Sequence, residues 1–135
     1  MNRLNVLVID DDPCFMPFLY QRYEASAEFV FATTETEMEE HLKKQKFDVI
    51  LMDGSLLGWR RGLSEGADVV RMLRSRGLAI PIIMFSGEQE RNESGMMAGA
   101  DAVWSKDNLY KKEAKMTLVA TIAVVRDIRI VRGVG

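Results

Sequence analysis

The chain contains a small set of acidic, hydroxyl and basic residues that follow apolar runs, and the first of them form an aspartate triplet. Asp10, Asp11 and Asp12 stand between the apolar run 6–9 and Pro13. Two like charges about 4 Å apart repel by roughly 4 kcal/mol at an effective dielectric constant near 20, so such a cluster favours a counter-charge. A hard divalent cation such as Mg²⁺ prefers carboxylate ligands. The triplet alone fits equally well a solvated turn in which Asp12 caps a helix that begins at Pro13.

Three later residues supply what a lone acidic turn lacks. Asp53, Ser86 and Lys106 each end or closely follow another apolar run. A carboxylate such as Asp53 can act as a nucleophile and form an acyl phosphate. The hydroxyl of Ser86 can hydrogen-bond a phosphoryl oxygen, and Lys106 offers a compact positive charge. With Mg²⁺ held by Asp10 and Asp11 near the developing charge, the set predicts phosphoryl chemistry.

The elements that must position these residues alternate between strand-like and helix-like segments. The predicted strands cover residues 4–9, 29–32, 49–52, 80–85 and 102–104. The predicted helices cover residues 14–24, 34–44, 67–76, 88–98 and 109–131, the first starting nearer Phe15 or Met16 because of Pro17. This alternation predicts an α/β fold with a doubly wound, five-stranded parallel sheet and five helices. The carboxyl ends of parallel strands share one edge, so the polar residues are expected to converge there.

Length and composition narrow the function classes. A chain of 135 residues predicts one domain, residues 1–135, without a separate output domain. The net charge of −2 gives no attraction to nucleic acid or to an anionic membrane. The single cysteine, Cys14, favours a reducing compartment, so we expect a cytoplasmic location. We expect neither a signal peptide nor a membrane span, since no apolar run has the required length and flanks.

Four segments together resemble the receiver domain of two-component response regulators. They are residues 6–13, 47–53, 81–87 and 98–106, which carry the aspartate triplet, Asp53, Ser86 and Lys106. The resemblance spans residues 4 to about 125. It is specific because the five polar positions occur in the family's order, each after an apolar run. It implies a flavodoxin-like fold with strand order 2-1-3-4-5.

The resemblance also implies roles for individual residues. Asp53 would accept a phosphoryl group from a histidine kinase or a phosphotransfer protein, with Mg²⁺ or Mn²⁺ as cofactor. Asp11, Asp53 and the backbone carbonyl of Ser55 would bind the metal, and Asp10 would act largely through water. Ser86 and Lys106 would bind the phosphoryl group. The family acts by signalling, through conformational change or oligomerisation, so no turnover of an external substrate is expected.

The loop after Asp53 departs from the family pattern because it is longer. It runs from Gly54 to Gly66 and carries Trp59 and Arg60. Two interpretations stay open, a flexible surface loop and a partner-specific flap over the site. The flap is suggested because exposed aromatic and arginine residues favour interfaces.

The stretch around Lys106 also departs from the family. Receivers usually carry an aromatic switch residue three positions before the lysine, and this chain has Val103 there. Trp104, the next residue, either substitutes as the switch or packs in the core. The family's proline after the lysine is replaced by Asp107, so we expect no cis bond, and Asp107 or Asn108 as the N-cap of the last helix. The segment from Ser86 to Lys106 is shorter than usual, so the helix over residues 88–98 is expected to be short or loose.

The last predicted helix has an apolar stripe formed by Leu118, Ile122 and Val125, which we expect to dock on the sheet. Val119 and Val124 make its other faces apolar too, which suggests a homodimer contact or a downstream module.

Two alternatives to phosphorylation at Asp53 stay open. A receiver-like interaction module would signal without phosphorylation, as the altered signalling face allows. A phosphatase of the haloacid-dehalogenase type would use Asp10 as nucleophile and Asp12 as acid/base, although Pro13 interrupts that motif.

Overall fold

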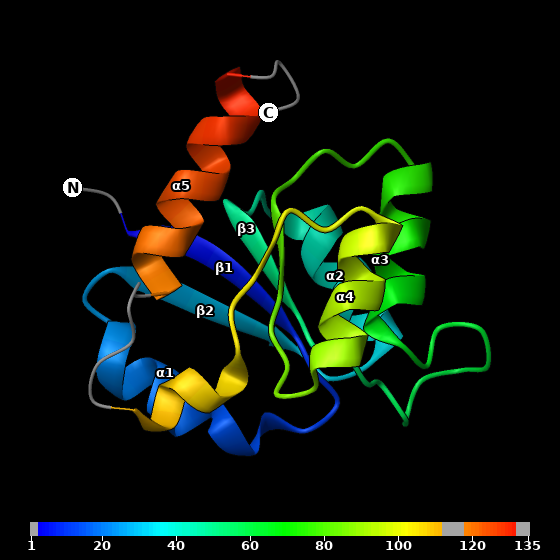
Figure 1. Ribbon diagram of the computed structural model, residues 1–135, viewed down its shortest axis with the longest axis horizontal. Coiled ribbons are helices and arrows are strands. Elements are labelled where there is room, and N and C mark those ends of the chain that lie inside the picture. Colours follow the sequence, from blue (N-terminus) through cyan, green and yellow to red (C-terminus); the bar gives the residue numbers. More distant parts are fainter. Residues whose placement is uncertain (1–2, 112–117, 132–135) are drawn as a thin grey trace.

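The computed structural model describes residues 3–111 and 118–131, which fold around one five-stranded sheet (Figure 1). The strands are β1 (Leu4–Ile9), β2 (Ala27–Ala32), β3 (Val49–Met52), β4 (Ile82–Met84) and β5 (Ala102–Val103). All neighbouring strands pair in parallel, in the order β2-β1-β3-β4-β5. The predicted fold class and strand order are therefore confirmed.

Five α-helices connect and cover these strands. They are α1 (Met16–Tyr23), α2 (Glu35–Lys44), α3 (Gly66–Ser75), α4 (Gln89–Ala98) and α5 (Leu118–Val131), with short 3-10 helices at Pro13–Phe15 and Lys106–Tyr110. Figure 1 shows α1 and α5 on one side of the sheet and α2, α3 and α4 on the other. No helix in residues 3–111 or 118–131 has the length and apolar character needed to cross a bilayer.

The central strands are apolar on both faces because each face is covered by helices. In β1, Val6 and Val8 belong to the core under α1 and α5, whereas Leu7 and Ile9 belong to the core under α2 and α3. The predicted stripe of α5 lies in the first of these cores, since Leu118, Ile122 and Val125 are all buried. Doubly covered strands leave only the sheet edges open to ligands, which places the site at an edge.

The strand register brings the polar residues together. Ile9 pairs with Met52 across β1 and β3, and Met52 pairs with Met84 across β3 and β4. The backbone N–H of Asp53 then donates to the carbonyl of Ile9 at 2.9 Å. Asp10 and Asp53 are thus the first residues beyond two adjacent, paired strands.

The sequence prediction for the carboxyl-terminal region was wrong in one respect. A single helix from Leu109 was expected, but residues 106–110 form a 3-10 helix that Ser105 caps with its side chain, in place of Asp107 or Asn108. Lys111 is extended, with φ −99° and ψ 138°, and this ends the short helix. The predicted helical residues 112–117 lie outside the described part of the chain, and α5 is described from Leu118.

Helix α4 also differs from expectation. It is a regular helix of ten residues, not a short or loose one. Gly95 allows the helix to lie close to the sheet, because a Cβ built there would lie 2.2 Å from Sδ of Met84. The helix backbone therefore rests directly on a side chain of β4.

We predict that Gly66→Ala destabilises the fold. A Cβ at Gly66 would lie 2.0 Å from the backbone carbonyl oxygen of Asp53, which has no rotamer to escape into. Overpacking of this kind lowers the free energy of unfolding by about 1–3 kcal/mol, measured by urea denaturation. Gly58→Ala is the matched control, since a Cβ there meets nothing within 4 Å. Equal stability of the two variants would contradict the prediction.

Candidate functional site

The centre of the site is a lysine between two aspartates from neighbouring strands. Nζ of Lys106 lies 2.5 Å from Oδ2 of Asp10 and 3.5 Å from Oδ1 of Asp53. Asp10 is 2% exposed. The ammonium group also lies 4.5 Å from the ring centroid of Phe15 and 5.4 Å from that of Phe85. Both aromatic rings attract the cation and keep water away from it, which strengthens its attraction to the carboxylates.

The aspartate triplet divides into residues with different partners. Asp12 accepts a hydrogen bond from the N–H of Cys14 at 3.2 Å and so caps the 3-10 helix that begins at Pro13, as predicted. Its own N–H donates to Oδ1 of Asp10 at 2.9 Å. Asp11 is partly exposed and accepts a hydrogen bond from the N–H of Gly58 at 3.2 Å. The carboxylates of Asp10 and Asp11 face the site, whereas that of Asp12 is used locally.

Burial and crowding change the proton affinities at the site. Burial, followed by the charge of Asp53, raises the pKa of Asp10 from 3.8 to about 7. Burial likewise raises the pKa of Asp53, although Lys106 opposes the shift. Burial alone would lower the pKa of Lys106, but its hydrogen bond to Asp10 and the charges of both aspartates raise it above its usual value. When all three groups are ionised, the two carboxylates carry one negative charge more than Lys106 neutralises.

A divalent cation fits this charge surplus. Asp10, Asp11 and Asp53 each offer a carboxylate oxygen, and these oxygens lie within 4.8 Å of one another. Oxygen donors at this spacing suit Mg²⁺ or Mn²⁺. An open cavity of about 340 Å³ surrounds the cluster, and its wall includes Ser55, Leu57, Ser86 and Lys106. Every residue predicted to bind metal or phosphoryl group therefore lines one cavity.

Ser86 joins the site to the following helix. Its Oγ accepts a hydrogen bond from the N–H of Glu88 at 3.0 Å, which leaves the hydroxyl hydrogen available to donate. Its backbone carbonyl accepts two further bonds, from Nδ2 of Asn92 at 3.0 Å and from the N–H of Lys106 at 3.3 Å. One carbonyl group thus links Asn92 of α4 to the backbone of Lys106 at the site.

The loop from Gly54 to Gly66 is attached to the rest of the domain, and its tryptophan is buried. Trp59 is 7% exposed, and its indole N–H donates to the carbonyl of Thr33 at 3.0 Å. Arg60 pairs with Glu35 at 2.8 Å. The loop is therefore anchored at Trp59 and Arg60, and the premise of an exposed aromatic ring is wrong. The loop does reach the site, through the Gly58 contact with Asp11 and through Leu57, which is 79% exposed at the rim of the cavity.

The two candidate switch residues lie in different environments. Val103 is on β5 with a side chain that is 41% exposed. Trp104 is buried and stacks on Phe85, with ring centroids 5.9 Å apart and an angle of 17° between the planes. Phe85 precedes Ser86, so the stacked pair lies beside the site and under α5.

Sequence reasoning missed three contacts at the site. The Gly58 hydrogen bond, the Phe15 ring under Lys106 and the Asn92 hydrogen bond all depend on tertiary structure. Asn92 left no signal, because an asparagine in a polar helix is ordinary and its burial is a property of the fold. The other two left none either, since a glycine N–H and a core phenylalanine are unremarkable in a sequence.

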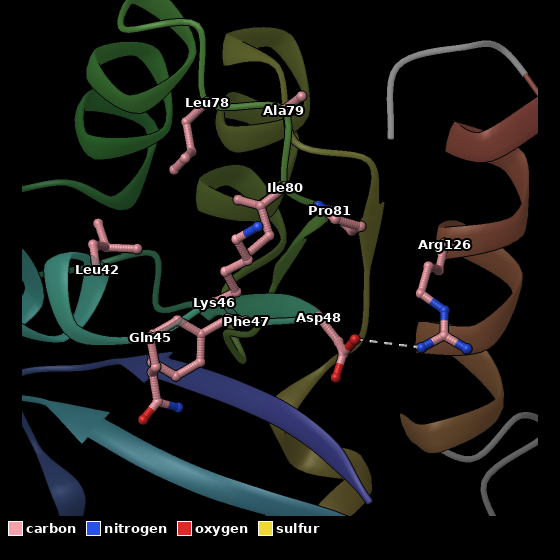
Figure 2. Close-up of a pocket in the computed structure, with 10 residues that line it drawn as sticks. All are labelled: Leu42, Gln45, Lys46, Phe47, Asp48, Leu78, Ala79, Ile80, Pro81 and Arg126. Atoms are coloured by element: carbon pink, nitrogen blue, oxygen red, sulfur yellow. Dashed lines mark ion pairs between the residues drawn. The ribbon is translucent and has the colours of Figure 1, made fainter. Parts of the chain in front are cut away.

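A larger pocket lies at the opposite, amino-terminal edge of the sheet (Figure 2). Its volume is about 450 Å³, and its wall is mainly apolar, with Phe47, Ile80 and Pro81 among the lining residues. Its carboxylate, Asp48, already accepts a hydrogen bond from the N–H of Asn5 at 2.7 Å and pairs with Arg126 at 3.5 Å. This pocket lacks the group of unneutralised carboxylates found at the other edge.

The fold and the site define a doubly wound α/β domain with an acidic, lysine-containing crevice where its parallel strands end. A family model described as the response regulator receiver domain matches residues 6–123. The chain therefore belongs to the family of response regulator receiver domains. A search among curated protein sequences finds no significant match.

Solved structures agree on the fold. A CheY-like receiver domain protein from Methanospirillum hungatei is 22% identical, with a TM-score of 0.72 over 98% of this chain and 100% of that one. The receiver domain of the Francisella response regulator 1452 is 20% identical, with a TM-score of 0.69 over 93% of this chain and 98% of that one. The chemotaxis protein CheY4 of Vibrio cholerae is 23% identical, with a TM-score of 0.66 over 92% and 99% of the two chains. At these identities the likeness concerns the fold alone.

The raised pKa of Asp10 predicts a pH-dependent stability without metal. A carboxyl group with a raised pKa favours the folded state at low pH, and this contribution is lost as the pH rises from 3.8 to about 7. Asp10→Asn should therefore be more stable than the wild type at pH 8 by about 1–2 kcal/mol, since one pKa unit is about 1.4 kcal/mol before screening. Urea denaturation in EDTA measures the difference.

The advantage of Asp10→Asn should shrink towards pH 4, where both forms are neutral at this position. Asp68→Asn, which changes a partly exposed carboxylate on α3 that pairs with Arg71 at the surface, corrects for the general loss of charge. A difference that stays constant between pH 4 and pH 8 would contradict the assignment.

Proposed function

We propose that this domain accepts a phosphoryl group on Asp53 in a reaction that requires Mg²⁺ or Mn²⁺. The observation that carries the proposal is the cluster of three carboxylates with ligand oxygens within 4.8 Å, next to a lysine that contacts two of them. Asp10, Asp11, Asp53 and the backbone carbonyl of Ser55 would hold the metal. The bound ion would neutralise the carboxylates and the incoming phosphoryl oxygens, so that like charges do not repel.

In the proposed transfer, a carboxylate oxygen of Asp53 forms a bond to phosphorus. The phosphorus–nitrogen bond of a phosphohistidine donor breaks, and its electron pair returns to the imidazole, giving an acyl phosphate on Asp53. Lys106 lies 3.5 Å from the attacking carboxylate and can pair with the product's phosphoryl oxygens. The free hydroxyl hydrogen of Ser86 can donate to another of these oxygens.

The proposed donor is a histidine kinase or a phosphotransfer protein, and the proposed location is the cytoplasm. The open cavity supports a protein donor because its rim carries exposed Leu57 beside partly exposed Asp11. The product would act by signalling, without turnover of an external substrate. A homodimer contact or a downstream module on α5 remains part of the proposal, supported by the 45% exposure of Val124.

The phosphatase alternative receives no comparable support. It needs Asp12 as an acid/base, but the carboxylate of Asp12 caps the helix that follows. It also needs Asp10 as an accessible nucleophile, whereas Asp10 is 2% exposed and paired with Lys106.

Incubation with acetyl phosphate and Mg²⁺ tests the proposal, with intact-protein mass spectrometry as the readout. We expect one added phosphoryl group on the wild type, none on Asp53→Asn and none with EDTA. Asp12→Asn is the matched acidic control, since asparagine caps helices as well as aspartate does, and it should keep the reaction.

Two results would sink the proposal: no mass increase on the wild type, or an undiminished increase on Asp53→Asn. Turnover of p-nitrophenyl phosphate that is abolished by Asp10→Asn but not by Asp53→Asn would instead favour the phosphatase.

A further inference from the structure

Helix α4 is attached to the sheet with little apolar burial. Its buried residues are Asn92 and Gly95, and neither brings a large apolar side chain to the core. Its two methionines point outward, since Met96 is 39% exposed and Met97 is 91% exposed. Most helices in domains gain their stability from a buried apolar face, so α4 depends more than usual on its packing beside α3, on the half-buried Ala98 and on a few specific polar contacts.

The specific contacts of α4 lead to the site. Nδ2 of Asn92 donates to the backbone carbonyl of Ser86 at 3.0 Å, and Asn92 is 5% exposed. At the first turn, Arg91 pairs with Glu88 at 2.8 Å and with Glu65 of the long loop at 3.0 Å. The buried hydrogen bond of Asn92 is better protected from water than these surface ion pairs, which contribute little individually.

The other polar atom of Asn92 is unsatisfied. Its Oδ1 is buried and has no hydrogen-bond partner among the described residues. An unsatisfied buried acceptor costs about 1–3 kcal/mol, so a leucine here would serve stability better than an asparagine does. The hydrogen bond to Ser86 is what distinguishes asparagine from an apolar side chain at this position.

We propose that Asn92 is a positioning residue that couples the state of Ser86 to the position of α4. This proposal rests on the proposed function, because it takes the phosphoryl group on Asp53 as the event that moves Ser86. When the hydroxyl of Ser86 turns to a phosphoryl oxygen, the carbonyl of the same residue moves with it. Asn92 follows that carbonyl and draws the lightly attached helix along, together with its exposed methionines.

The residues before Lys106 lack the family's usual aromatic switch, so another connection between Ser86 and α4 is useful in this chain. Val103 has no aromatic ring to occupy space vacated by Ser86, and its side chain is exposed. Trp104 is stacked on Phe85 in the core. A hydrogen bond that runs from the backbone of Ser86 into α4 needs neither ring to move.

Hydrogen exchange of the phosphorylated full chain tests the coupling. Mass spectrometry of peptides from residues 89–98 compares exchange with and without acetyl phosphate and Mg²⁺, with the phosphorylated fraction read from intact mass. In the wild type, phosphorylation should change the hydrogen-exchange rates of the α4 amides by about fivefold or more, a size typical of allosteric coupling. Asn92→Leu keeps the branched shape of the side chain but removes the donor, and should lose most of this change while still accepting the phosphoryl group.

A binding equilibrium gives a second readout that a merely structural role would not move. Fluoroberyllate, a tetrahedral analogue of a phosphoryl group, is titrated with Mg²⁺ and followed by tryptophan fluorescence. Asn92→Leu and Asn92→Ala should bind it about fivefold more tightly than the wild type, since the site no longer has to move α4. Ser94→Ala, on the exposed face of the same helix, should match the wild type.

The outcomes separate the two proposals. Absence of phosphorylation on the wild type overturns the proposed function and this inference with it. Phosphorylation of the wild type without a change in α4 exchange overturns only the coupling. A full α4 response in folded Asn92→Leu, or unchanged fluoroberyllate affinity in both Asn92 variants, also overturns the coupling.

Discussion

The balance between three carboxylates and one lysine is the interaction on which the rest of the structure depends. The parallel register of β1 and β3 holds Asp10 and Asp53 beside each other. The backbone of neither residue can move away without breaking a hydrogen bond between strands. Lys106 lies against both of them, yet the pKa of each aspartate stays raised because burial outweighs its charge. Placing uncompensated charge at a functional edge lowers stability, a compromise that proteins make where chemistry requires it.

The surrounding elements keep this cluster in place without neutralising it. Gly66 lets the first turn of α3 lie against the backbone carbonyl of Asp53, where any side chain would collide. Trp59 fixes the long loop through its hydrogen bond to Thr33, so that Gly58 reaches Asp11. The polar cluster is therefore supported by contacts that are themselves mostly apolar or made by backbone atoms.

The strand pattern and the strand-end residues were predictable from the sequence because they follow local rules. Doubly covered parallel strands are continuous apolar runs, and their carboxyl ends share an edge, so Asp10, Asp53 and Lys106 converge by topology. What failed was the set of features that depend on tertiary contacts. Trp59 of the long loop was expected to be exposed, but a tryptophan's burial depends on a partner surface that local sequence does not reveal. The last helix was drawn too long because Lys111 adopts an extended backbone for which its sequence gives no turn signal.

Helix α4 is another element whose sequence and tertiary contacts point in different directions. Its polar sequence predicts a loose helix, yet Gly95 lets the backbone rest on Met84 and the hydrogen bond of Asn92 reaches the carbonyl of Ser86. A helix held by a close backbone contact and a buried hydrogen bond has little apolar surface to re-expose when it moves, so its displacement costs less than that of α5, whose apolar stripe is buried. Ser86 lines the cavity beside Asp53, and its carbonyl accepts the hydrogen bond from Asn92 of α4. A change of charge at Asp53 that moved Ser86 would therefore be passed to the helix whose displacement costs least.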